Sequence, residues 1–111
     1  MSALTSAELA AGRKGKVLVD IRKPDEWRTT GIIDGCHRLT YNGQDLDGWL
    51  EDLEQIATPD DELVLVCRTG HRTGILLDYL HRQTPYRQAR HLAGGILDWI
   101  ANGLPVVAIE K

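Results

Sequence analysis

The chain has 111 residues, of which 42% are hydrophobic and 26% are charged, a composition typical of a single globular domain spanning residues 1–111. Thirteen basic and sixteen acidic side chains give a formal net charge of −3, which argues against a surface devoted to nucleic acid. No stretch approaches the roughly 20 apolar residues that a membrane helix requires. Charged side chains also interrupt residues 1–16, where a signal peptide would be apolar. We therefore expect a cytoplasmic protein without nucleic-acid or membrane partners.

Helix and strand signals alternate through the first half of the chain. Thr5 followed by Glu8 fits a capping box at the start of a short helix. The β-branched and apolar run before Asp20 is typical of a strand that is buried on both faces. In chain order, the predicted elements are a helix over residues 5–11, a strand over 17–19, a turn or short helix from Pro24 to Arg28, a weaker strand over 36–40 and a helix from Leu46 to Ile56.

The second half of the chain contains the clearest buried strand, residues 63–66, which runs directly into Cys67. The elements predicted after it are a loop containing Gly70, a helix carrying Ile75, Leu76, Tyr79 and Leu80, a candidate strand over 88–92, and a last helix between Gly94-Gly95 and Asn102-Gly103. This alternation predicts an α/β fold with a mostly parallel central sheet and helices on both faces. Ligands of such sheets bind beyond the carboxyl ends of the strands, which is where Cys67 is expected.

An anion site is predicted in the loop Cys67-Arg68-Thr69-Gly70-His71-Arg72. Unpaired backbone N–H groups converge where a strand passes into a helix, and with the helix dipole they favour an anion such as a thiolate. The two arginines add positive charge, and the glycine lets the backbone curl without a side-chain clash. We therefore expect the thiolate of Cys67 to attack a sulfur donor and to keep one sulfur atom as a persulfide.

The same loop, with its cysteine first and basic residues within, resembles the six-residue active-site loop of the rhodanese family. Other segments that resemble family signatures are Val19-Asp20-Ile21-Arg22 with Pro24-Asp25-Glu26-Trp27, Ile33-Asp34-Gly35-Cys36, and His91-Leu92-Ala93-Gly94-Gly95-Ile96 through Trp99 with Gly103-Leu104-Pro105-Val106. The similarity covers about residues 4–107, and weak motifs become a strong signal when four stand in the right order. Two positions depart from the family: Ile32 stands where His is frequent, and Cys36 where Ala is usual.

The resemblance implies a rhodanese-like three-layer fold and a sulfurtransferase of the thiosulfate type. Cys67 would be the catalytic nucleophile, and the substrate-binding residues would be Arg68, Thr69, Gly70, His71 and Arg72. The substrates would be a small anionic sulfur donor and a thiol or cyanide acceptor, and an acceptor protein is an open alternative. We expect no cofactor and no metal, because two cysteines 31 positions apart form no zinc-binding pattern.

Several residues have plainer interpretations beside the functional ones. A free cysteine is commonly a buried small hydrophobe, but the arginines around Cys67 argue against this role. Which arginine of the loop meets the substrate stays open, because one of them could turn back to brace the loop. Asp20 is interpreted as a structural hydrogen-bond or arginine partner, and Cys36 as a packed small residue, with a resolving thiol as its lesser alternative. Structural or surface roles are predicted for His37, His81 and His91, and core positions for Trp27, Trp49 and Trp99.

Two other classes of function compete with sulfur transfer. Cysteine phosphatases and some arsenate reductases also use a loop from cysteine to arginine, but their signature places five residues between the two. Here four residues separate Cys67 from Arg72, which predicts a tighter loop suited to one sulfur atom. A non-catalytic binding or regulatory module is the second alternative, although such modules usually lack the cysteine. An intermediate hypothesis is a sulfur carrier that passes its sulfur to a partner protein.

Overall fold

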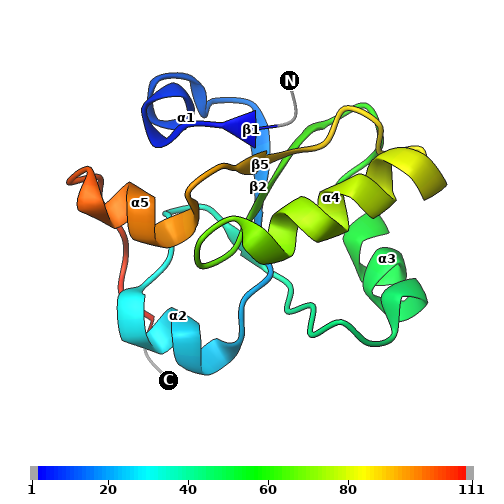
Figure 1. Ribbon diagram of the computed structural model, residues 1–111, viewed down its shortest axis with the longest axis horizontal. Coiled ribbons are helices and arrows are strands. Elements are labelled where there is room, and N and C mark those ends of the chain that lie inside the picture. Colours follow the sequence, from blue (N-terminus) through cyan, green and yellow to red (C-terminus); the bar gives the residue numbers. More distant parts are fainter. Residues whose placement is uncertain (1–2, 110–111) are drawn as a thin grey trace.

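The structure is a computed structural model that describes residues 3–109. Within this range, one sheet of five strands is packed between five helices (Figure 1). The strands are β1 (Ala3–Leu4), β2 (Lys16–Asp20), β3 (His37–Arg38), β4 (Glu62–Val66) and β5 (Arg90–Leu92). The helices are α1 (Ser6–Gly12), α2 (Pro24–Thr30), α3 (Leu46–Glu54), α4 (His71–Gln83) and α5 (Gly95–Ala101). None of these helices is long and apolar enough to cross a membrane.

The sheet has the strand order β1-β5-β4-β2-β3, with β4 at its centre. The two longest strands, β2 and β4, run in register from the pair Lys16 and Glu62 to the pair Asp20 and Val66. All pairings between the five strands are parallel. The carboxyl ends of the strands therefore lie at one edge of the sheet, and the segments that follow β2, β3, β4 and β5 gather there.

Helices cover both faces of the sheet because its central strands are apolar on both sides. Leu63 and Leu65 of β4 belong to one core cluster, together with buried side chains of α3 and α4 such as Trp49. Val64 and Val66 belong to the other cluster, together with side chains of α1, α2 and α5. The predicted three-layer α/β fold is therefore confirmed.

The local structure differs from the sequence prediction mainly at the ends of elements. The predicted capping box is present: the Thr5 side chain accepts a hydrogen bond from the Glu8 N–H at 3.1 Å, and the Glu8 carboxylate accepts one from the Thr5 N–H at 2.9 Å. Strand β3 spans only two residues and β5 only three, and α3 ends at Glu54 rather than Ile56. The sequence does not predict β1, because two residues are too short for a periodic pattern.

Candidate active site

Cys67 directly follows β4 at the carboxyl edge of the sheet, as the sequence predicts. Helix α4 then begins at His71, with Gly70 as its N-cap residue. The Cys67 side chain has 0% exposure and belongs to the same core cluster as Leu65 and Leu76. The thiol therefore lies between the end of a buried strand and the start of a helix, enclosed by protein.

Two polar groups contact the sulfur of Cys67. The backbone N–H of Gly70 donates a hydrogen bond to Sγ at 3.1 Å, and the hydroxyl oxygen of Thr73 lies 3.4 Å from Sγ. Thr73 is fully buried in the first turn of α4, so its hydroxyl is fixed beside the sulfur. The Gly70 N–H stabilises negative charge on the sulfur, as a nucleophilic thiolate requires. The Thr73 hydroxyl has one proton, and besides Sγ its neighbours are the Gly70 carbonyl oxygen at 3.3 Å and Nδ1 of His91 at 2.8 Å.

The first turn of α5 forms hydrogen bonds to two carbonyl groups of the active-site loop. The N–H of Ile96 donates to the carbonyl oxygen of Cys67 at 2.9 Å, and the N–H of Leu97 donates to that of Arg68 at 3.1 Å. In a trans peptide, the C=O and N–H groups point in opposite directions. These two bonds therefore turn the N–H groups of Arg68 and Thr69 away from α5 and fix the orientation of the loop.

Two glycines allow the loop to lie against the chain that follows β5. Gly70 has φ of +98°, and a Cβ there would overlap the carbonyl oxygen of Ala93. Gly95 has φ of +67°, and a Cβ there would overlap the carbonyl group of Arg68. Both positions lie in the left-handed region that favours glycine, and in both a side chain would meet backbone atoms. Gly70 therefore allows the loop to curve, as predicted, and a second glycine outside the loop is required for the same close approach.

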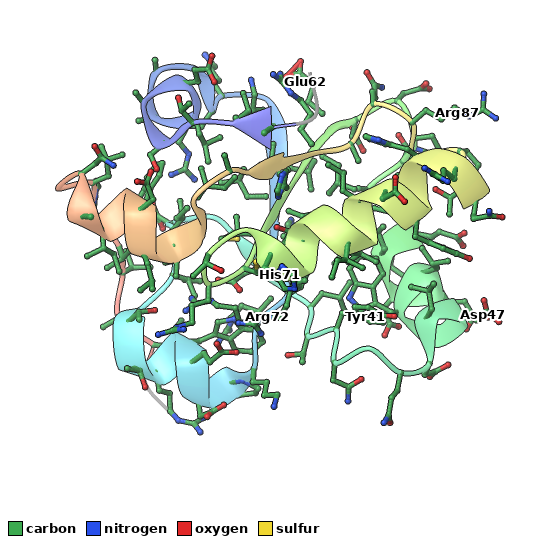
Figure 2. All side chains as sticks on the ribbon, in the orientation of Figure 1. Tyr41, Asp47, Glu62, His71, Arg72 and Arg87 are labelled. Carbon is green, nitrogen blue, oxygen red and sulfur yellow. The ribbon has the colours of Figure 1, made fainter. Side chains whose placement is uncertain are left out.

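Arg72 turns towards α2, where its guanidinium forms two hydrogen bonds to the carboxylate of Glu26, at 3.0 and 2.8 Å. Figure 2 shows Arg72 between the start of α4 and α2. The hydrogen bonds from Arg72 lower the pKa of Glu26 to about 2, although burial of the carboxyl group acts in the opposite direction. Of the two arginines in the loop, Arg72 is therefore the one that links the loop to α2.

Replacing Glu26 with glutamine is expected to lower the free energy of unfolding by about 1 kcal/mol at neutral pH, because the ion pair is only partly buried. The pKa of Glu26 is lowered from 4.5 to about 2 in the folded protein. Its stabilising contribution is therefore fully present above pH 4.5 and is lost as the pH falls towards 2. Urea unfolding of both proteins at neutral pH and near pH 3 measures this difference.

The matched control for Glu26 is Glu62→Gln, which breaks an ion pair with Lys16 at the other edge of the sheet. The Glu62 side chain is 59% exposed, so a much smaller change is expected there. If the difference in unfolding free energy between Glu26→Gln and the parent were the same at both pH values, the ion pair would not be the source of the effect.

The remaining predicted substrate-binding side chains, those of Arg68, Thr69 and His71, are exposed at the rim of the loop. Arg68 takes part in none of the ion pairs formed within residues 3–109. It lines a cavity of 120 Å³ together with Leu97 and residues of α2. The residues of α2 in this lining include Asp25 and Glu26, so the binding of an anionic donor by Arg68 stays a prediction.

Thr73 and His91 are neighbours of the candidate nucleophile, and no sequence motif marks either residue as functional. The Nδ1 atom of His91 lies 2.8 Å from the hydroxyl oxygen of Thr73, so polar contacts run from β5 through this hydroxyl to the sulfur of Cys67. Burial lowers the pKa of His91, which favours a neutral imidazole. His91 reaches the site because β5 pairs with β4, in a register that places it beside Leu65.

Asp20 has the structural role predicted for it. Its fully buried carboxylate accepts hydrogen bonds from the Arg22 guanidinium at 2.9 and 3.1 Å. Arg22 also donates to the Thr30 hydroxyl at 2.9 Å and to the Gly31 carbonyl at 3.0 Å. The pair therefore ties the end of β2 to α2, the helix that carries Glu26 towards the loop.

Cys36 is 8% exposed and packs in the core cluster opposite to that of Cys67. Burial raises the pKa of its thiol, so a reactive thiolate is disfavoured at this position. These observations agree with its interpretation as a packed small residue. The tryptophans predicted to be core residues are all buried, namely Trp27, Trp49 and Trp99.

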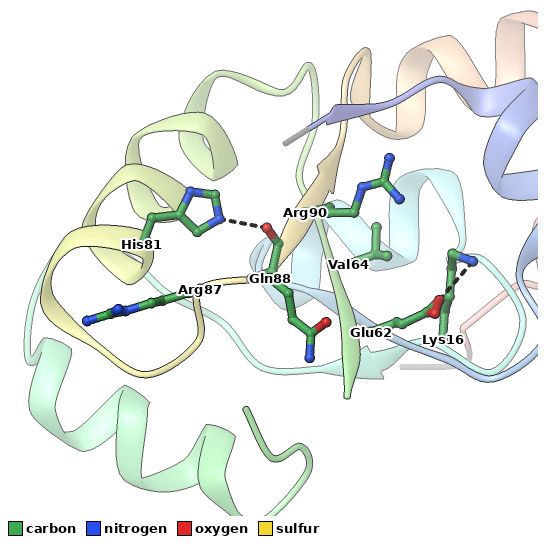
Figure 3. A pocket seen from close by; sticks show the side chains of 8 residues that line it. Lys16, Glu62, Val64, His81, Arg87, Gln88 and Arg90 are labelled. Carbon is green, nitrogen blue, oxygen red and sulfur yellow. Dashed lines mark hydrogen bonds and ion pairs between the residues drawn. The ribbon is translucent and has the colours of Figure 1, made fainter. Parts of the chain in front are cut away.

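A larger hollow of 540 Å³ lies at the opposite, amino-terminal edge of the sheet (Figure 3). Four of its lining residues are basic or histidine, but their polar groups do not converge. Lys16 pairs with Glu62 at 3.1 Å, and Figure 3 shows the side chains of Arg87 and Arg90 pointing apart. The loop that begins at Cys67 is therefore the better candidate for an active site.

Comparison with known proteins identifies the family. The model of the rhodanese-like domain family matches residues 5–102. A protein of Allochromatium vinosum described as a sulfurtransferase is 35% identical over 95 residues, which are 85% of this chain and 80% of that protein. The chain therefore belongs to the rhodanese-like domain family, as its four motifs indicate.

Solved structures with low sequence identity share the fold. A rhodanese-related protein of Thermoplasma volcanium has a TM-score of 0.78 and 23% identity, and covers 98% of this chain and 100% of its own. A Rhodopseudomonas palustris protein of unknown function, described as a possible tyrosine phosphatase, has a TM-score of 0.72 and 24% identity, and covers 96% of this chain and 85% of its own. At these identities the likeness concerns the fold alone.

Proposed function

We propose that this protein is a sulfurtransferase that moves a sulfane sulfur from an anionic donor such as thiosulfate to a thiophilic acceptor, cyanide or a thiol, through a persulfide on Cys67. The observation that carries the proposal is the hydrogen bond from the Gly70 N–H to the enclosed Cys67 sulfur, at 3.1 Å. The similarity to a relative described as a sulfurtransferase supports it.

In the first half-reaction, the Cys67 thiolate attacks the outer sulfur of thiosulfate. A bond forms between Sγ and that sulfur, the sulfur–sulfur bond of thiosulfate breaks, and sulfite leaves with the bonding electron pair. Sulfite is a stable anion, so its departure needs no general acid. Arg68 is exposed beside the loop, and we expect its charge to attract the anionic donor.

In the second half-reaction, the acceptor attacks the terminal sulfur of the persulfide. With cyanide, a carbon–sulfur bond forms, the bond from Sγ to the terminal sulfur breaks, and thiocyanate leaves while Cys67 returns to a thiolate. The Gly70 N–H stabilises that thiolate as a leaving group, and we expect the Thr73 hydroxyl, 3.4 Å from Sγ, to donate to it as well. The site therefore holds the same anion at the start and at the end of the cycle.

An assay with two substrates tests the proposal. The protein is given thiosulfate with cyanide in one reaction and an aryl phosphate in another. We expect thiocyanate to form and the phosphate ester to remain intact. Phosphate release without thiocyanate would overturn the proposal in favour of the phosphatase alternative.

Arg68→Ala is expected to raise the KM for thiosulfate by about threefold to tenfold, because it removes an exposed charge beside the loop. The effect should shrink as salt is added, since attraction between exposed charges is screened over about 8–10 Å at moderate ionic strength. Steady-state kinetics across a salt series measure it. Arg82→Ala, at the far end of α4, is the control, and equal KM values in both variants would exclude Arg68 as the attracting cation.

Thr73→Val is expected to slow persulfide formation by roughly tenfold to a hundredfold, because a hydrogen bond to a charged group contributes about 1.5–3 kcal/mol. Valine has a similar shape and removes only the hydroxyl that lies 3.4 Å from Sγ. Rapid-quench mass spectrometry of the persulfide measures the rate. The control is Thr84→Val, which removes a hydroxyl from the other end of α4, and equal rates in the two variants would show that the Thr73 hydroxyl does not stabilise the sulfur.

The phosphatase alternative has less support from the geometry. A phosphate ester needs an arginine whose guanidinium faces the anion, whereas the guanidinium of Arg72 is bound to Glu26. The sulfur-carrier alternative uses Cys67 in the same way and differs only in the acceptor. Slow turnover with cyanide together with rapid persulfide formation would favour the carrier role.

Further predictions concern the whole chain. One rhodanese domain is predicted to span residues 1–111, and the two core clusters on opposite faces of a single sheet support this. The cytoplasmic location remains a prediction from the amino-acid sequence, as do the absence of a cofactor and of a nucleic-acid partner.

A further inference from the structure

A second hollow lies at the same edge of the sheet as Cys67, with a volume of 340 Å³. Its walls come from the segments after β2 and β3 and from the first two turns of α4. The lining residues are Lys23, Tyr41, Asn42, Gly43, Arg72, Ile75 and Leu76. Figure 2 shows Tyr41 and Arg72 on the same side of α4.

The hollow is adjacent to the candidate active site through two of its lining residues. Arg72 is the last residue of the active-site loop and also forms part of the wall. Leu76, one turn further along α4, lines the hollow and belongs to the same core cluster as Cys67. A molecule in this hollow would therefore lie next to the loop that holds the sulfur.

One wall of the hollow is apolar and held in place. Ile75 is 64% exposed, more than the other large hydrophobic side chains that reach the surface within residues 3–109. Tyr41 lies opposite α4, where its backbone N–H donates to the Ile21 carbonyl at 3.0 Å. Its ring packs against Trp49 with 5.7 Å between the ring centroids. The apolar wall is therefore present without any rearrangement of the chain.

The rim of the hollow is positive. Lys23 and Arg72 are cations, and none of the seven lining residues is acidic. Arg72 shares its charge with Glu26, so Lys23 supplies the less compensated positive charge. The combination of an apolar wall and a lysine at the rim complements a molecule that has an apolar body and an anionic group.

We propose that the physiological acceptor is a small organic thiol with an apolar body and an anionic group, bound in this hollow. The inference rests on the proposed function. Cyanide is too small to fill 340 Å³, and hydrated inorganic anions gain nothing from an apolar wall. The apolar body would lie on Tyr41 and Ile75, and the anionic group would meet Lys23.

The transfer step follows from this placement. The thiol loses its proton to solvent, and its thiolate attacks the terminal sulfur of the Cys67 persulfide. A new sulfur–sulfur bond forms on the acceptor, and the bond from Sγ to the terminal sulfur breaks. The Cys67 thiolate leaves with the electron pair, stabilised by the Gly70 N–H, and the acceptor departs as an organic persulfide.

Three acceptor thiols test the proposal: mercaptopropionate, its phenyl-substituted derivative, and mercaptopropanol as the uncharged analogue. The persulfide is first formed with thiosulfate and verified by intact mass, and its decay with each thiol gives kcat/KM. Burial of a phenyl ring on the apolar wall is expected to raise kcat/KM by roughly tenfold over mercaptopropionate. Mercaptopropanol is expected to be the slowest acceptor.

Two variants assign these preferences to the hollow. Ile75→Ala is expected to reduce the advantage of the phenyl derivative to about threefold or less, because it removes most of the exposed apolar wall. Lys23→Gln is expected to reduce the preference for mercaptopropionate over mercaptopropanol. Ile100→Ala, an exposed isoleucine on α5 outside the hollow, serves as the control and should retain both preferences.

The outcomes separate this inference from the proposed function. If the persulfide forms but all three thiols react alike, or if Ile75→Ala behaves as Ile100→Ala does, the acceptor assignment is overturned and the sulfurtransferase proposal stands. If thiosulfate produces no persulfide on Cys67, both are overturned.

Discussion

Replacing Cys67 with serine is expected to abolish sulfur transfer while the fold is retained. The hydroxyl of serine is far less nucleophilic than a thiolate and forms no persulfide, so no residual route remains through this residue. The serine oxygen would still be able to accept a hydrogen bond from the Gly70 N–H, which donates to Sγ at 3.1 Å in the parent protein. We therefore expect the free energy of unfolding to change by only about 1 kcal/mol.

The matched control is Cys36→Ala, because Cys36 is the other cysteine of the chain and is likewise buried. The thiocyanate assay should show nearly parental activity for this variant and none for Cys67→Ser. Circular dichroism and urea unfolding verify that both variants are folded. Transfer activity that persisted in Cys67→Ser, or vanished in Cys36→Ala, would contradict the assignment of the nucleophile.

Gly95→Ala is expected to have the second largest effect, although Gly95 lies outside the active-site loop. A Cβ there would overlap the Arg68 carbonyl group, and this overlap is with backbone, which cannot move aside as a flexible side chain does. The loop would have to shift away from α5, which would break the hydrogen bond from Ile96 to the Cys67 carbonyl. Misplacing a donor relative to a developing charge costs roughly 3–4 kcal/mol, so persulfide formation should fall by more than about a hundredfold.

Gly103→Ala separates this overlap from ordinary backbone strain. Gly103 also has a positive φ, +75°, but nothing lies within 4 Å of a Cβ placed there. Its substitution should cost only the strain of the left-handed region, about 1–2 kcal/mol, and should leave the rate of persulfide formation unchanged. Equal losses of activity in the two variants would show that the contact between Gly95 and the loop does not position the site.

The sequence predicts the position of Cys67 in the fold well because the signals for it are local. A continuous apolar run indicates the buried strand β4, and Cys67 with its basic neighbours follows at once. The end of a strand in a parallel sheet is also a position where chemistry is expected. The cysteine, the helix start and the glycine between them were therefore all predictable from residues 63–72.

The partners of the loop were not predictable, because they depend on contacts between distant segments. Glu26 lies 46 positions before Arg72, and their ion pair requires α2 to pack below the start of α4. His91 reaches Thr73 only through the pairing of β5 with β4. Periodicity describes which face of an element is buried, but it does not state which elements become neighbours.

Intact mass spectrometry after exposure to thiosulfate shows whether Cys67 carries the transferred sulfur. We predict that the parent protein gains the mass of one sulfur atom, that cyanide removes it, and that Cys67→Ser gains none. Fragmentation should place the added sulfur on Cys67 and not on Cys36, whose thiol pKa is raised by burial. An unchanged mass in the parent, or an added sulfur located on Cys36, would contradict the assignment of the transferred sulfur to Cys67.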